Sequence, residues 1–225
     1  MPKGYLIAQV DVTDPLAYQA YVAANALAFT KYGAQFLVRG GQALLAEGRF
    51  RQRLVVLEFV SLQAATACYH SPEYARAMAL RQGASVADIA LVAGPDAPDP
   101  AAPPRTAPAR AYWIVAGHEA DPGDDRSLVA AWNDALARCG GRVLVSGTAA
   151  LRPEGRFPAR IAVIGFPSLQ AATECYHTPD HGRPVAMRQG QGQKREQAQA
   201  QAQGQLSLAI LPGYDGPQPG DPAID

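Results

Sequence analysis

An internal duplication constrains the fold of this chain more than any other feature of its sequence. A shift of 107 positions aligns residues 5–83 with residues 112–190 without a gap, and about 36 of the 79 aligned pairs are identical. The longest shared stretch begins at Ser61 and again at Ser168, and it reads SLQAAT-CYH in both copies. We therefore expect two domains of one fold, which also suits the length of 225 residues.

The boundaries of the copies follow from shifts in composition. We place the first domain (copy one) at residues 1–94 and the second domain (copy two) at residues 111–213. The segment 95–110 is rich in Pro and Ala, which predicts a stiff, extended linker. A Gln/Ala-rich insertion at about 191–205 has no apolar face and predicts a solvated excursion. Residues 214–225 are rich in Pro, Gly and Asp, and we expect them to form a disordered tail.

The sequence of each copy predicts strands and helices in the order βαββαβ. Asp14 followed by Pro15 is typical of a helix start, and Gly33 marks the end of that helix. Ser61 has the position of an N-cap for the second helix, and Ser71-Pro72 restarts a short helical turn. Apolar runs predict the strands of copy one at 4–10, 34–41, 53–59 and 88–94.

This order is that of a ferredoxin-like unit, in which helices cover one face of a four-stranded sheet. The other face needs a partner, and a second unit of the same chain can supply it. We therefore expect an α+β fold in which two ferredoxin-like units pack sheet to sheet as an intrachain α/β barrel.

Three stretches of copy one carry a family resemblance: KGYLIAQVDVTDPLAYQAY, KYGAQFLVRGG and VVLEFVSLQAATACYHSPEY. They resemble the family named domain of unknown function 1330 (DUF1330), closely over residues 3–94 and more loosely over 111–213. The resemblance implies the dimeric α/β-barrel superfamily, which includes cofactor-free monooxygenases, isomerases and haem-binding proteins. It implies the barrel architecture but no reaction, because the family has no assigned one.

Composition and motifs exclude several classes of function. Twenty basic and twenty acidic residues cancel, which argues against a nucleic-acid partner. Three cysteines without a CxxC motif and a short N-terminal apolar run predict a cytoplasmic protein without a membrane span. GxGxxG, Walker, GxSxG and HExxH motifs are absent, so we expect no cofactor. The expected partner is a small molecule, and the chain is either a monomeric pseudo-dimer or a further homodimer.

Positions at which the copies differ are the best places to look for chemistry. Arg39 becomes Ser146 and Glu58 becomes Gly165 in copy two. Arg39 and Glu58 lie on neighbouring predicted strands, so they either form a structural ion pair or belong to a site. Alternatively, the Glu58 carboxylate simply reaches solvent. In a site, Arg39 would bind an anionic substrate, and Glu58 or Asp11 would act as acid or base. Copy one would then hold the site.

The repeated stretch supplies further candidates. Tyr69 falls on the expected buried stripe of its helix and has a structural role or, with Tyr21, contacts the substrate. His70 lies at the edge of this stripe and could act as a general base. Arg81, within an RQG sequence, is expected to be a charge at the surface or at a helix end.

Copy two contains potential metal ligands, but we predict no metal site there. Pro179 interrupts the helix among these residues, so they need not share one face. The potential ligands are Cys175, His177, Asp180 and His181.

Two classes of function remain open. One is a small cofactor-independent enzyme of isomerase, lyase or oxygenase type acting on a small organic molecule. Its catalytic candidates are Glu58, Asp11 and His70, and its substrate-binding candidates are Arg39, Tyr69 and Tyr21. The other is a ligand-binding or structural module without turnover. A pocket in which Arg39 and Glu58 converge would favour the enzyme, whereas surface ion pairs would favour the module.

Overall fold

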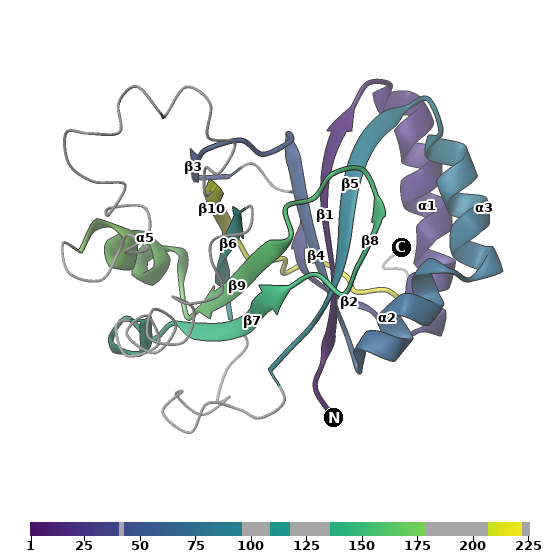
Figure 1. Cartoon of the computed structure of the whole chain (residues 1–225). Coiled ribbons are helices and arrows are strands. Elements are labelled where there is room, and N and C mark those ends of the chain that lie inside the picture. Colours follow the sequence, from purple (N-terminus) through teal and green to yellow (C-terminus); the bar gives the residue numbers. More distant parts are fainter. Residues whose placement is uncertain (41–42, 96–108, 118–135, 179–206, 222–225) are drawn as a thin grey trace.

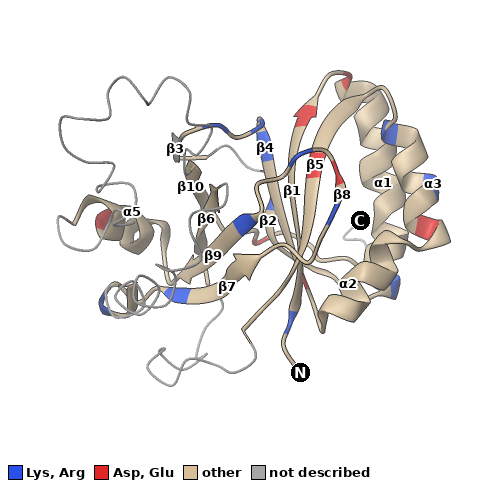
Figure 2. Cartoon of the chain, viewed as in Figure 1, with Lys and Arg blue, Asp and Glu red and all other residues tan. Residues whose placement is uncertain are grey.

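Two antiparallel β-sheets face each other across the centre of the molecule, with helices on the outer side of each (Figure 1). A computed structural model describes residues 1–40, 43–95, 109–117, 136–178 and 207–221. Figure 2 shows few charged residues on the strands, and most of these lie near strand ends. The expected pair of ferredoxin-like units is confirmed.

Copy one has the predicted βαββαβ order. Its sheet runs β2-β4-β1-β5, and every neighbouring pair is antiparallel. Its elements are β1 (Gly4–Val12), α1 (Pro15–Lys31), β2 (Gln35–Arg39), β4 (Arg53–Phe59), α2 (Leu62–Tyr69), α3 (Pro72–Arg81) and β5 (Ser85–Ala93).

Copy two repeats this sheet in the order β10-β6-β9-β7. The predicted Gln/Ala-rich insertion and all but the ends of the predicted linker lie outside the described residues. The described elements are β6 (Ala111–Gly117), β7 (Arg142–Thr148), β8 (Leu151–Glu154), β9 (Arg160–Phe166), α5 (Leu169–His177) and β10 (Ser207–Pro212).

The two copies exchange a short strand. β3 (Leu45–Glu47) of copy one pairs with β10, and β8 of copy two pairs with β5. Each strand precedes the glycine of an EGRF sequence, and Gly48 and Gly155 have φ angles of 78° and 64°. A Cβ at Gly155 would collide with Asp88, so this turn needs glycine both for its backbone and for space. The sequence predicted the turns but not their crossing to the other sheet.

The space between the sheets is filled by side chains of both copies. Ile7 and Val56 meet Ile114 and Val163, and all four are fully buried. Burying one such aliphatic side chain contributes about 1.5–3 kcal/mol, so this shared core holds the copies together. The interior of the barrel is therefore a core and not a channel.

The caps of the copy-one helices match the sequence signals. Asp14 accepts hydrogen bonds from the backbone of Leu16 and Ala17, and Ser61 caps α2 through Ala64. The restart at Ser71 is longer than predicted, because α3 continues for ten residues. Cys68 is also buried on α2, beside the expected Tyr69.

The C-terminal segment 214–221 packs against β2, which is the edge strand of its sheet. The Tyr214 amide donates to the Leu37 carbonyl at 2.9 Å. The Gln218 side chain accepts from the Phe36 amide at 2.7 Å and donates to the Phe36 carbonyl at 3.1 Å. The prediction of disorder is therefore wrong for 214–221, because a free strand edge offers partners that composition does not reveal. Residues 222–225 lie outside the described residues.

Candidate functional site

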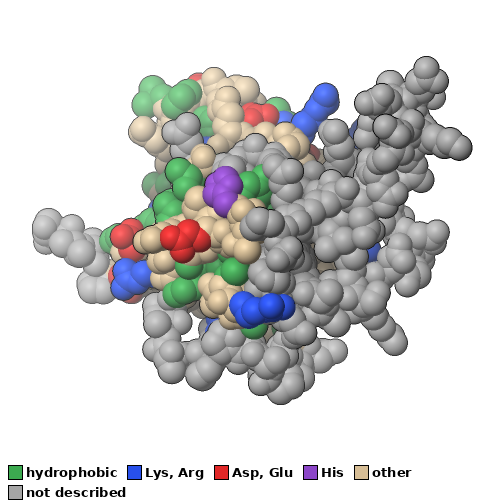
Figure 3. Space-filling view, turned by 90° about the vertical axis from the view of Figure 1, so that its left-hand side faces the viewer, with side chains coloured by type: hydrophobic (Ala, Val, Ile, Leu, Met, Phe, Trp, Pro, Cys, Tyr) green, Lys and Arg blue, Asp and Glu red, His purple; other side chains and the backbone are tan. Residues whose placement is uncertain are grey.

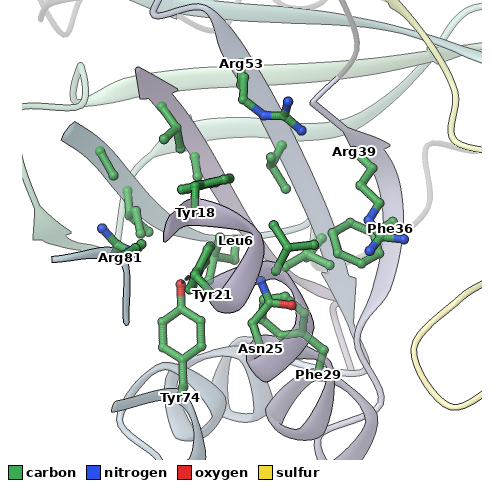
Figure 4. A pocket seen from close by; sticks show the side chains of 17 residues that line it. Leu6, Tyr18, Tyr21, Asn25, Phe29, Phe36, Arg39, Arg53, Tyr74 and Arg81 are labelled. Atoms are coloured by element: carbon green, nitrogen blue, oxygen red, sulfur yellow. Dashed lines mark hydrogen bonds between the residues drawn. The ribbon is translucent and has the colours of Figure 1, made fainter. Parts of the chain in front are cut away.

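A cavity of about 60 Å³ lies between the sheet of copy one and its helices α1 and α3 (Figure 4). Alternation along the strands places one set of side chains in the cavity wall and the other set in the barrel core. The wall receives Leu6, Ala8 and Val10 from β1, Arg53, Val55 and Leu57 from β4, and Ala87 and Ile89 from β5.

A bulge in β2 brings Arg39 into the same wall. The pairing of β2 with β4 shifts register between Phe36 and Val38. Leu37 and Val38 both pack toward the barrel core, whereas Phe36 and Arg39 line the cavity. The bulge therefore aims Arg39 at a site to which simple alternation would not direct it.

Three arginines line the cavity, and Figure 4 shows Arg39 and Arg81 on opposite sides of it, with Arg53 above. None of the described residues that line it is a carboxylate. Among the described residues, neither Arg39 nor Arg53 forms an ion pair. The Nε of Arg53 is buried without a hydrogen-bond partner in the part of the chain that is described. The cavity therefore concentrates positive charge.

Aromatic rings hold the two unpaired guanidinium groups. The Cζ atom of Arg39 lies 4.6 Å from the centroid of the Phe36 ring and 5.2 Å from that of Tyr214. Its Nη1 donates to the Tyr214 hydroxyl at 2.6 Å. The Cζ of Arg53 lies 6.0 Å from the centroid of the Tyr18 ring. Ring faces attract these cations without neutralising them.

Arg81 is held differently. It is 7% exposed, and its Nη2 donates to both carboxylate oxygens of Glu154, with a distance of 2.6 Å to Oε2. Tyr69 also donates to Glu154, at 2.7 Å. Arg81 is the last residue of α3, as the predicted helix-end position requires, but the predicted surface exposure is wrong, because the exchanged strand β8 buries the side chain. Tyr69 is buried beside the cavity rather than in its lining.

Tyrosines form the helix side of the cavity. The hydroxyls of Tyr21 and Tyr74 lie 3.1 Å apart and share a hydrogen bond. Burial, with the neighbouring Tyr21, raises the pKa of Tyr74 well above its ordinary value. Burial also raises the pKa of Tyr18 to about 12. Tyr18 and Tyr74 are therefore protonated at neutral pH and can donate hydrogen bonds to an anion.

Glu58 lies away from the cavity. Lys3 is 3.2 Å from its Oε1, and the Tyr5 hydroxyl donates to its Oε2 at 3.0 Å. In the register of β2 with β4, Glu58 is opposite Gln35 and Arg39 is opposite Val55. The expected pairing of Arg39 with Glu58 is therefore wrong, because the two residues lie at opposite ends of this strand pair.

Asp11 and His70 are also outside the cavity lining. Asp11 accepts hydrogen bonds from the Gln52 amide and from Arg51, and these bonds lower the pKa of its carboxyl. His70 is exposed at the C-cap of α2, with its ring centroid 5.2 Å from that of Tyr69. Of the six residues named from the sequence, only Arg39 and Tyr21 line the cavity.

Copy two differs at the position equivalent to Leu6. Trp113 occupies this position, is fully buried and packs against Phe166 and Tyr176. Its Nε1 donates to the Ala172 carbonyl at 3.1 Å. The larger side chain occupies space on the side of the sheet where copy one has its cavity.

The groups needed for a metal or a haem are not gathered among the described residues. No cluster of three or more His, Cys, Asp or Glu side chains occurs there, and Asp180 and His181 lie outside them. His177 of α5 is exposed, and Figure 3, which views this side of the molecule, shows a histidine at the surface. The cavity lining has no His, Cys or Met, so its residues do not fit a haem iron. No described helix is long and apolar enough to cross a membrane.

Fold and site together define a dimeric α/β-barrel protein whose two units are fused and whose first unit has an arginine-lined cavity. The model of the family described as domain of unknown function (DUF1330) matches residues 3–95 and again residues 110–198. The chain therefore belongs to the DUF1330 family, as a tandem duplication. No curated protein shows significant sequence similarity to it.

Solved structures with the same architecture span nearly the whole chain. An anthrone oxidase-like protein is 11% identical with a TM-score of 0.53, covering 98% of this chain and 94% of its own. A proposed monooxygenase from Lactobacillus acidophilus NCFM is 10% identical with a TM-score of 0.52, covering 96% and 100%. A proposed chlorite dismutase is 8% identical with a TM-score of 0.50, covering 96% of each chain. At these identities the likeness shows the fold alone.

Proposed function

We propose that copy one binds a small organic anion, a carboxylate in the first instance, in the cavity between its sheet and α1. The observation that carries this proposal is the pair of guanidinium groups, Arg39 and Arg53, that line an apolar cavity without a carboxylate partner among the described residues. Both side chains are partly buried, and an anion bound in the cavity would neutralise their charges.

The shape of the cavity supports a small ligand with one charged end. Arginine presents paired N–H donors that match a carboxylate, and the buried, unpartnered Nε of Arg53 is available for such a bond. The apolar wall of Leu6, Ala8 and Val55 suits a hydrocarbon body. A volume of about 60 Å³ exceeds what one water needs several times over and is small for a nucleotide.

Turnover in this cavity is the second candidate function. The hydrogen-bonded hydroxyls of Tyr21 and Tyr74 favour it, because a protonated phenol can donate to a substrate oxygen. The proposed monooxygenase and the anthrone oxidase-like protein of similar fold suggest an oxygenase type. We place binding first, because the lining has no carboxylate or imidazole to act as a base near neutral pH.

The experiment is calorimetric titration with benzoate and 3-methylbutanoate, each compared with its neutral amide. We expect both carboxylates to bind and both amides to bind at least about tenfold more weakly, because only the anion neutralises the arginines. Arg53→Gln should weaken carboxylate binding by about tenfold or more and leave the amides unchanged.

Arg76→Gln is the matched control, because Arg76 is exposed on α3 and is not part of the lining. Equal affinity of the protein for acid and amide, or a full affinity in Arg53→Gln, would contradict the proposal. Oxygen consumption in the presence of a bound carboxylate would distinguish turnover from binding alone.

A further inference from the structure

The C-terminal segment 214–221 reaches the cavity of copy one although it follows the last strand of copy two. Figure 1 shows the yellow end of the chain leaving β10 and crossing to the sheet of copy one. Three hydrogen bonds dock it on β2: Tyr214 binds Leu37, and Gln218 binds both backbone groups of Phe36. Phe36 lines the cavity, so this segment lies directly behind its wall.

Tyr214 also controls the orientation of Arg39. Its hydroxyl accepts a hydrogen bond from Arg39 Nη1 at 2.6 Å and donates to the Pro217 carbonyl at 3.1 Å. Its ring stacks edge-on against Phe36, with centroids 5.7 Å apart. A long arginine side chain has several rotamers in solvent, and these contacts select one of them before a ligand arrives.

The chemistry of this contact suits a positioning role. A carboxylate at Tyr214 would neutralise Arg39 and compete with an anionic ligand. A phenol fixes the guanidinium but leaves its positive charge for the ligand. The remaining donors of Arg39 can then face the cavity, whose wall the residue forms.

We propose that residues 214–221 form a strap that completes the anion site of copy one, with Tyr214 as a positioning residue for Arg39 and Gln218 as its anchor. This inference rests on the proposed function of the cavity. The strap follows the last strand of copy two and docks on copy one, so it links the two copies. A ligand that binds better when the strap is docked also increases the fraction of molecules in which the strap is docked.

Docking is tested first without any ligand. Hydrogen exchange of the full-length protein should show slow exchange at the Phe36 and Tyr214 amides. Gln218→Ala should accelerate exchange at these amides, whereas Gln63→Ala, at an exposed position on α2, should not. Unchanged exchange in Gln218→Ala would overturn the strap as an anchored element.

Positioning is tested with benzoate as the probe. Tyr214→Phe keeps the ring and removes the hydroxyl, and we expect benzoate affinity to fall roughly threefold to tenfold. In Arg39→Gln the same change should have no further effect, because Tyr214 acts through Arg39. A purely structural role would instead lower affinity equally in both backgrounds.

The outcomes separate the two proposals. If the wild-type protein binds benzoate and Tyr214→Phe binds it equally well, the strap inference fails and the proposed function stands. If the wild-type protein binds no carboxylate, the proposed function fails and the positioning role falls with it. Hydrogen exchange would then report only that the segment docks.

Discussion

The four arginines of copy one that are buried or partly buried divide into two groups by what surrounds them. Arg51 contacts Asp11 and Asp88, and Arg81 contacts Glu154, so these guanidinium groups have carboxylate partners. Arg39 and Arg53 have aromatic rings instead. Removing a paired arginine strands a carboxylate and destabilises the fold, whereas removing Arg39 or Arg53 strands none. The charges of Arg39 and Arg53 therefore remain available to an anionic ligand.

A single substitution can give the copy-one cavity the tryptophan of copy two. In Leu6→Trp the indole N–H would face the Ala65 carbonyl, which corresponds to the Ala172 carbonyl that Trp113 contacts. We expect the variant to fold with a loss of about 1–3 kcal/mol from overpacking. Benzoate binding should fall about tenfold or more, because the ring occupies the cavity. Leu6→Ile, which conserves volume, should bind benzoate as the wild type does. Calorimetric titration of both variants with benzoate measures the difference.

The sequence allowed part of this site to be predicted. Arg39 stood out because copy two has serine at the equivalent position, and Tyr21 stood out because copy two has Leu128 at its equivalent position. Arg53 gave no such signal, because copy two also has arginine at position 160. The available clue was alternation along the strand, which places the side chain of Arg53 on the same face of the sheet as Val55 and Leu57. The burial of Arg81 could not be predicted, because its partner Glu154 comes from a strand whose crossing no local pattern encodes.

Among the elements, the exchanged strands decide how the copies join. β8 extends the sheet of copy one beyond β5, and the turn after it brings the Arg156 amide to within 2.7 Å of Asp88 Oδ1. Asp88 also accepts from Arg51 Nε at 2.7 Å and from Gln9 at 2.9 Å. One buried carboxylate thus connects β1, β5 and both EGRF turns.

The longer strands were predictable because each contains a largely apolar run of residues. Their pairing across copies was not, because β3 and β8 are only three and four residues long. Strands this short have no pattern of their own. The docking of 214–221 was missed for a related reason, since hydrogen bonds to a strand edge depend on position and not on composition.

The Asp88 cluster predicts a specific pH dependence of stability. Burial alone would raise the pKa of the Asp88 carboxyl, but hydrogen bonds from Arg51, the Arg156 amide and Gln9 outweigh it and lower the pKa. A lowered pKa in the folded state stabilises the protein above the ordinary value of about 3.9, and this contribution is lost as the pH falls through the lowered value. We expect Asp88→Asn to cost roughly 2–3 kcal/mol at pH 7.

Urea unfolding of the wild-type protein and of Asp88→Asn from pH 7 to pH 2 measures this effect. The difference in unfolding free energy should be constant above about pH 5 and should shrink below about pH 4. Gln63→Ala is the control for an unrelated surface change. A difference that stays constant down to pH 2 would mean that the ionised carboxylate does not support the fold.

At the scale of the whole molecule, fusion lets two copies of one fold become different. A dimer of identical units has two identical cavities, whereas here only copy one has Arg39 and the strap. The sheets still meet through a continuous apolar core that contains Val38 and Leu54 of one copy and Val145 and Ile161 of the other. The sheet of each copy covers the apolar barrel face of the other sheet, which would otherwise be exposed to water.

This dependence makes a prediction for copy one on its own. A fragment of residues 1–95 would expose the barrel face of its sheet and lose Glu154, the partner of Arg81. Glu47 is the residue of copy one equivalent to Glu154. A second copy of the fragment can supply both the apolar face and this carboxylate, so we expect the fragment to form a homodimer. Light scattering after gel filtration measures its mass.

Glu47→Gln tests whether the fragment pairs in the same way as the fused chain. In the fragment it should weaken the dimer by about tenfold or more, because it leaves Arg81 of each partner without its counter-charge. In the full-length chain the same substitution should leave the stability of copy one unchanged, since Glu154 contacts Arg81 there. A monomeric, folded fragment would show that the apolar barrel face does not require a partner, and the physical argument for the duplication would then be wrong.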